Sequence, residues 1–296
     1  MTRNPTPPPP PVSSVLMPVL SHPADQPSSI IDTPPPTTTT LLPAIRQHTF
    51  PLPKIRLHLD DIPHAGTALF LSHTHGHTDL STQIQNVLNL LYRPDSPRPG
   101  TRSVTFVLHA FAGVAYTTGT ELDGDHKEIH VSLDYIHGRR GLRAEEIRDE
   151  ILGVINHELV HCFQYSADGT CNAGLIEGMA DYVRLKSGLA AKHWKREASG
   201  SWDGGYQHTG YFLDWLERKC GAGTVRSINA MLGEMSEYDG DRLFRSCCGG
   251  KTAEAWWGEY REELVRKGGE TATEEGKTVP TGTPPRHDAA RGTSVR

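Results

Sequence analysis

The sequence predicts an α+β fold with one folded domain. Strand-like alternation of apolar and polar residues is confined to the stretch before residue 143, whereas amphipathic helical patterns dominate after it. Both ends of the chain are poor in large apolar residues, so the core must come from the part between them. At 296 residues and 36% hydrophobic content, the chain is long enough to bury a sizeable core.

Prolines and threonines mark the N-terminal limit of the domain. Fifteen of the 22 prolines lie within residues 1–53, together with a run of threonines. We therefore expect residues 1–50 to be a disordered Pro/Thr-rich segment. From about residue 267 onward no aromatic residue occurs and Gly, Thr, Glu, Lys and Pro dominate, which predicts a second disordered tail over 268–296. Residues 51–267 are expected to form the single domain.

Four segments of this domain have the pattern of β-strands. In residues 54–61, Ile55, Leu57 and Leu59 alternate with polar residues. Gly119 and the Asp-Gly pair at 123–124 predict turns. The other predicted strands are residues 102–110, 113–118 and 128–135.

Helices are expected mainly in the second half of the domain. One helix is predicted earlier, at 81–92, where Ile84, Val87, Leu88 and Leu91 recur at helical spacing. The later predicted helices are residues 144–166, 174–187, 205–220, 222–234 and 252–266. The expected architecture is a small N-terminal sheet followed by a helical C-terminal half.

Charge and hydropathy argue against two classes of partner. The net charge is -5, the pI is near 6.3, and no cluster of Lys or Arg stands out, which argues against nucleic-acid binding. No apolar run approaches the roughly 18–20 residues of a membrane span. We expect a monomer that binds neither nucleic acid nor membrane.

The N-terminus and the cysteines predict the cellular compartment. The first residues do not lead into the apolar stretch of about 7–15 residues that a signal peptide needs. The five cysteines are an odd number in a long chain, which argues against a disulfide framework. Free thiols in an intracellular, cytoplasmic protein are therefore expected, while a Cys162–Cys171 disulfide and secretion by a non-standard route stay open.

The strongest chemical signal is the motif His157-Glu158-Leu159-Val160-His161. Two histidines four residues apart on a helix differ by about 40° in azimuth and about 6 Å in rise, so both imidazoles can reach one metal ion. Glu158 projects beside the metal, where its carboxylate can accept a proton from a water that the metal activates. An apolar ladder on another face of the segment indicates the helix that this geometry requires: Ile147, Ile151, Ile155, Leu159 and Phe163.

A third ligand is expected downstream, because catalytic zinc takes three protein ligands and keeps one open position. Residues 166–173 are a turn-rich loop that lets the chain reverse, and the next helix carries Glu177 and Asp181 on one face. Glu177 is the expected third ligand. Asp181 is expected to accept the second ring N–H of a ligand histidine, although Asp181 as the ligand stays open. A histidine ligand at position 167 is excluded, because that residue is Ala167.

Three sequence features together carry a family resemblance: HELVH at 157–161, GLIEGMADYVRL at 174–185, and the segments 202–206 and 212–214. They resemble the plant basic secretory protein family of peptidases, which also occurs in fungi and bacteria, over roughly residues 52–265. The resemblance implies a zincin-like, gluzincin-type metallopeptidase. It would hold one zinc ion through His157, His161 and Glu177 and use Glu158 as general base. The plant members are secreted, whereas this N-terminus has no signal-peptide pattern.

The predicted function is zinc-dependent hydrolysis of peptide bonds in a peptide or protein substrate. An oxyanion donor besides the metal is expected, because a tetrahedral intermediate carries negative charge on oxygen. Tyr206 is the expected donor, with His208 as the second choice, since both stand at the start of a helix after two glycines. By analogy with the fold, residues 128–135 are expected to be an edge strand that binds the substrate backbone.

Two other functions stay open. The first is a catalytically inactive zincin-fold protein that binds a peptide or partner, against which the intact Glu158 speaks. The second is a metallo-β-lactamase-like hydrolase that uses His73, His75, His77 and Asp79. The final histidine of that motif is missing, and a His-rich surface loop is expected there instead.

Overall fold

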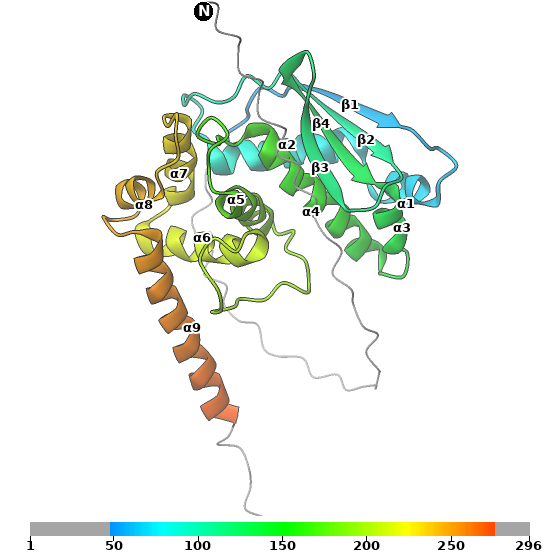
Figure 1. Ribbon diagram of the computed structural model, residues 1–296. Helices are drawn as coiled ribbons and strands as arrows, with labels where there is room; N and C mark the ends of the chain where they lie inside the picture. The colour runs from blue at the N-terminus through cyan, green and yellow to red at the C-terminus, as the bar shows by residue number, and fades with distance from the viewer. Residues whose placement is uncertain (1–47, 276–296) are drawn as a thin grey trace, which may run out of the picture.

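The computed structural model describes residues 48–275, and this part of the chain has the predicted α+β fold (Figure 1). A four-stranded sheet lies against a stack of helices, and most of the helices follow the sheet in the sequence. The two predicted tails fall mainly on residues 1–47 and 276–296, which lie outside the described residues.

Three strands of the sheet are parallel and the fourth is antiparallel. The parallel strands are β1 (Lys54–Leu59), β2 (Ser103–His109) and β4 (Asp123–Ser132). β3 (Ala115–Thr120) forms a hairpin with β4. The strand order is β1-β2-β4-β3, so β1 and β3 are the edges of the sheet.

The prediction that residues 128–135 form an edge strand was wrong. Residues 128–132 belong to β4, which lies between β2 and β3. Ser132 then ends the strand and caps a short helix, α3 (Leu133–Gly138), by accepting a hydrogen bond from the Tyr135 backbone N–H (3.2 Å). The edge on this side is β3, because the short turn after Thr120 makes it the antiparallel neighbour of β4 and nothing pairs with its other side in the described chain.

The predicted helices are present, with shifted ends. They are α2 (Gly76–Leu91), α4 (Ala144–Phe163), α5 (Ala173–Lys186), α6 (Tyr206–Cys220), α7 (Thr224–Gly233) and α9 (Ala253–Glu275). Three others were not predicted: α1 (Ala65–His73), α3 and α8 (Gly240–Cys247). α1 is apolar over much of its length without a clear polar face, and α3 and α8 are too short for a sustained periodic pattern.

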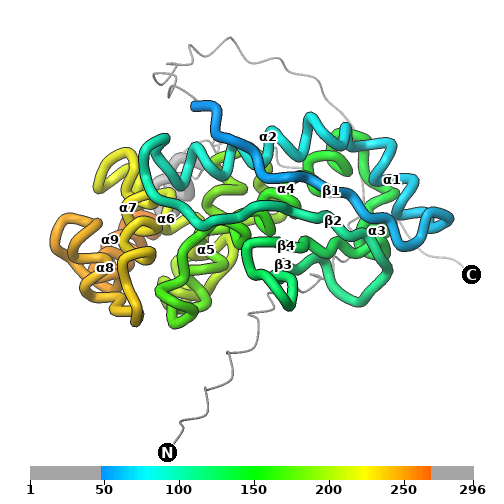
Figure 2. The backbone as a smooth tube through the Cα atoms, turned by 90° about the horizontal axis from the view of Figure 1, so that it is seen from above, coloured from blue at the N-terminus to red at the C-terminus, as the bar shows by residue number. Residues whose placement is uncertain are grey.

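α4 is the central helix of the molecule. It lies against the sheet beside α2, with α5 on its other side and α6 beyond α5 (Figure 1 and Figure 2). Every residue of its predicted apolar ladder is at most 4% exposed: Ile147, Ile151, Ile155, Leu159 and Phe163. α4 is therefore covered by both the sheet and the helices, and Asn156, His157 and Glu158 in its C-terminal half are shielded from bulk water.

α5 and α6 pack closely because Gly178 meets Thr209. A Cβ at position 178 would lie 2.3 Å from the Thr209 side chain, so only glycine allows this approach. Gly178 thus keeps α5 slim at this helix crossing. The contact also brings the start of α6, with Tyr206, close to the α4–α5 pair.

Two sequence-based expectations, no membrane span and free thiols, concern the helices and the cysteines. No helix between residues 48 and 275 combines the length and the apolar character that crossing a membrane requires. The five cysteines are free thiols, and Cys162 is buried within α4.

Candidate metal centre

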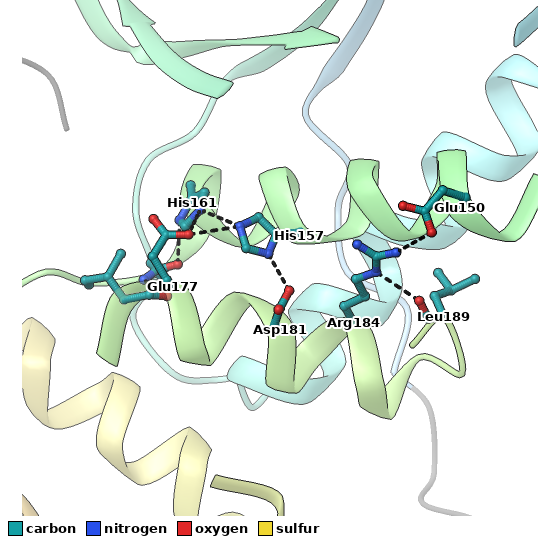
Figure 3. Close-up of polar contacts among 9 residues, drawn as sticks. Glu150, His157, His161, Glu177, Asp181, Arg184 and Leu189 are labelled. Carbon is teal, nitrogen blue, oxygen red and sulfur yellow. Dashed lines mark hydrogen bonds and ion pairs between the residues drawn. The ribbon is translucent and has the colours of Figure 1, made fainter. Parts of the chain in front are cut away.

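The candidate site lies where α4 and α5 face each other (Figure 3). His157 and His161 are one turn apart on α4. The loop at 166–171 reverses the chain, and Asn172 begins α5 by accepting a hydrogen bond from the Leu175 backbone N–H (3.0 Å). This start of α5 places Glu177 opposite the two histidines.

Three side-chain atoms converge on one point. His157 Nε2 lies 3.1 Å from Glu177 Oε2 and 3.2 Å from His161 Nε2. His161 Nε2 lies 3.7 Å from Glu177 Oε2. His157 is fully buried, while the side chains of the other two residues retain about a tenth of their exposure, so the cluster opens to solvent on their side.

Each histidine is oriented through its other ring nitrogen. His157 Nδ1 donates a hydrogen bond to Asp181 Oδ1 (2.7 Å), as predicted for Asp181. His161 Nδ1 donates to Gln164 Oε1 (3.1 Å), and Gln164 Nε2 donates to the Ile176 carbonyl oxygen (3.2 Å). With each Nδ1 held by its acceptor, both Nε2 atoms face Glu177, where they can bind a metal ion once they carry no proton.

The charges around this point favour a cation. Burial disfavours an imidazolium, but the Asp181 and Glu177 carboxylates outweigh it and raise the pKa of His157 to about 10. Burial alone would raise the pKa of Glu177, yet its hydrogen bonds to His157 and His161 hold that pKa well below the usual range. Two imidazole nitrogens and a carboxylate oxygen are ligands that zinc accepts, so the donor set fits the metal that the sequence predicts.

Glu158 stands apart from the converging atoms. It is fully buried, and burial raises the pKa of its carboxyl group. Glu158 Oε2 accepts a hydrogen bond from Thr117 Oγ1 of β3 (2.7 Å). Glu158 Oε1 is buried and has no hydrogen-bond partner among the described residues. The carboxylate is thus held on one side and free on the other.

Tyr206 lies over the site from the start of α6. Its ring is parallel to the His157 ring, with centroids 6.1 Å apart. Tyr206 has a backbone φ of 46°, which is uncommon for a residue with a side chain, and it follows Gly205 at φ 80°. Burial raises the pKa of its phenol to about 12, so the hydroxyl keeps its proton at neutral pH. The second choice, His208, instead contacts the Ser201 carbonyl oxygen through Nε2 (2.9 Å).

The alternative metal cluster does not form in the described part of the chain. Its four residues end α1 and begin α2: His73, His75, His77 and Asp79. Asp79 accepts two hydrogen bonds from Arg148 (2.6 and 2.7 Å), and His73 Nδ1 donates to the Leu69 carbonyl oxygen (2.8 Å). Within that same part, the group with metal-binding geometry is the His–His–Glu set of α4 and α5. The expected His-rich surface loop is right only in part, since His75 and His77 are exposed but the loop itself is limited to Thr74 and His75 between two helix ends.

A comparison with protein families agrees with the geometry. The family model BSP, described as peptidase of plants and bacteria, matches residues 52–260, which is more than half of the chain. The chain belongs to the BSP family. No curated protein and no solved structure matches it. The BSP match includes every residue of the site described above, from Thr117 on β3 to Tyr206 on α6.

Proposed function

We propose that this BSP-family protein is a zinc-dependent peptidase of the zincin type, with His157, His161 and Glu177 as ligands and Glu158 as general base. The observation that supports it most is the convergence of two Nε2 atoms and one carboxylate oxygen beside a separately held, buried Glu158. A protein that only binds metal or a partner has no need of such a carboxylate.

Zinc bound here would polarise the scissile carbonyl and lower the pKa of the attacking water. Glu158 accepts a proton from that water through Oε1, the oxygen that has no partner in the described residues, and passes it to the leaving amine. Burial favours this role, because it raises the pKa of Glu158 toward the range in which a carboxyl group both takes and gives protons.

Tyr206 is the donor that we assign to the developing oxyanion. Its ring lies parallel to His157, and its phenol remains protonated at neutral pH. The positive φ at the first residue of α6 supports a functional reason for this placement, because such strain is retained where the surroundings require it.

We assign substrate binding to β3. This edge strand carries unpaired backbone groups along its outer side, within the described chain, and a side chain of the same strand contacts Glu158. An extended peptide that pairs with β3 would therefore lie beside the general base. The substrate class that fits is a peptide or an unfolded protein segment.

Replacing Glu158 with Gln tests the proposal. Because Glu158 is not a ligand, Glu158→Gln should retain one zinc ion, yet hydrolysis of a casein-type substrate should fall by about 10²–10⁴-fold. Glu145→Gln, an exposed glutamate in the first turn of the same helix, is the matched control and should behave as wild type. Loss of zinc from Glu158→Gln, or hydrolysis at the wild-type rate, would show that the roles are assigned wrongly.

A further inference from the structure

The Glu158 carboxylate is held by one side chain from the edge of the sheet. Thr117 Oγ1 lies 2.7 Å from Glu158 Oε2 and 3.0 Å from the Glu158 carbonyl oxygen. Among the described residues, no other side chain donates a hydrogen bond to either carboxylate oxygen. The two residues are 41 positions apart in the sequence, so the contact exists because of the way α4 packs against β3.

Strand register directs the Thr117 hydroxyl toward α4. Thr117 pairs with Ile129 of β4, which is fully buried, and paired residues point to the same face of a sheet. Thr118 and its partner Glu128 therefore point to the opposite face. A shift of one residue in this register would remove the hydroxyl from the site.

A single hydrogen bond matters for this carboxylate because the last side-chain torsion angle of glutamate, χ3, has a broad distribution. Without a fixed oxygen, the group could rotate and present either lone pair to any neighbour. With Oε2 held by Thr117, the buried and unpartnered Oε1 has one defined direction. A buried carboxylate without a hydrogen bond destabilises the fold, so loss of the bond to Thr117 would cost free energy.

We propose that Thr117 is a positioning residue that fixes Glu158 through Oε2 and leaves Oε1 to take the proton from the attacking water. The inference rests on the proposed function and deepens it, since β3 is also the strand to which we assign substrate binding. One strand then sets the position of both the substrate backbone and the general base.

Steady-state kinetics test the positioning role. Thr117→Val keeps the shape of the side chain and removes the hydroxyl, so kcat should fall about tenfold or more while KM and zinc content stay at wild-type values. Thr117→Ser restores a hydroxyl and should recover kcat to within about threefold of wild type. Thr105→Val is the control and should behave as wild type. It makes the same change on β2, but on the face of the sheet opposite to Thr117. A wild-type kcat in Thr117→Val, or equal losses in the Val and Ser variants, would overturn the inference.

A double-mutant cycle tests the contact without substrate or metal. In the metal-free protein, Thr117→Val should lower the folding equilibrium constant about tenfold when Glu158 is present and less than about threefold in a Glu158→Leu background. Equal losses in the two backgrounds would refute the contact, whatever the enzyme does. Conversely, zinc-loaded wild-type protein that hydrolyses no casein would refute the proposed function. The double-mutant cycle would still measure the Thr117–Glu158 contact, so the two failures are distinguishable.

Discussion

Each histidine of the site has one ring nitrogen held by a neighbouring side chain and leaves the other facing the candidate metal position. Asp181 and Gln164 accept the Nδ1 protons, and the two Nε2 atoms meet 3.2 Å apart. A metal-ligating histidine usually has such a partner, because the partner fixes the tautomer and the direction of the ring. The difference between Glu177 and Asp181 is therefore one of position: Glu177 meets both Nε2 atoms, whereas Asp181 meets only the far nitrogen of His157.

A zinc titration of two variants should separate these roles. Glu177→Ala removes the proposed third ligand and should abolish tight zinc binding. Asp181→Asn keeps a hydrogen-bond acceptor for His157 and should retain zinc with an affinity about 10–100-fold lower. If Asp181→Asn empties the site while Glu177→Ala binds zinc normally, the third ligand is Asp181.

The sequence predicted the residues of this site that follow from helix geometry. The spacing of His157 and His161 determines that both rings can reach one metal ion, and Glu177 and Asp181 lie one turn apart on the next helix. Gln164 and Thr117 were not predicted. The role of Gln164 depends on its side-chain torsions at the end of α4, and that of Thr117 depends on which strand packs beside Glu158. Local patterns contain neither kind of information.

The positions of strands and helices were more predictable than their arrangement. Alternation and helical spacing located β1, β2 and α4 to within a few residues. The order of the strands was not predictable in the same way, because β4 inserts between β2 and β3 through a parallel pairing with β2 that no local pattern specifies. The wrong edge strand is a direct consequence.

A partly buried ion pair links α2 and α4. Asp79 accepts two hydrogen bonds from Arg148 and one from the His75 backbone N–H (2.6 Å). Burial alone would raise the pKa of Asp79, but the Arg148 bonds outweigh it and hold the pKa below its ordinary value of 3.8. A lowered pKa means that the pair stabilises the fold above about pH 4 and that this contribution disappears as Asp79 takes up a proton at lower pH.

Asp79→Asn should therefore lower the free energy of unfolding of the metal-free protein by about 2 kcal/mol at pH 7. The difference from wild type should shrink as the pH falls below about 4, which urea denaturation at pH 7 and pH 3 would measure. The matched control is Asp241→Asn, which removes an exposed pair with Arg245 (3.7 Å) and should have little effect at either pH. A difference that is the same at pH 7 and pH 3 would contradict the account.

The sheet, α4, α5 and α6 form one stack, with α7, α8 and α9 at one end of it (Figure 1). The N-terminal limit of this body lies slightly before the predicted residue 51. Phe50 is 3% exposed, and its backbone exchanges two hydrogen bonds with the Gln85 side chain of α2 (2.9 and 2.7 Å). Composition could not indicate this, because Phe50 follows a proline-rich stretch and precedes two more prolines.

Two fragments should show whether the folded part of the chain includes Phe50. A protein of residues 48–275 should melt within about 2 °C of the full chain, because it retains the buried contacts described here. A protein of residues 54–275 loses Phe50 and should be less stable by about 3 kcal/mol, the cost of removing a buried phenylalanine side chain. Thermal unfolding monitored by circular dichroism measures both, and equal melting temperatures for the two fragments would show that Phe50 does not hold the N-terminal end in place.

The proposed function requires that α4 and α5 together form a zinc site. The most direct test is the zinc content of the purified protein after dialysis against a zinc-buffered solution. One zinc ion per chain is the predicted result for wild type, and also for a variant in which His73, His75 and His77 are all alanine, because those residues lie outside the site. A folded wild-type protein that retains no zinc, or a triple variant that loses it, would contradict the account.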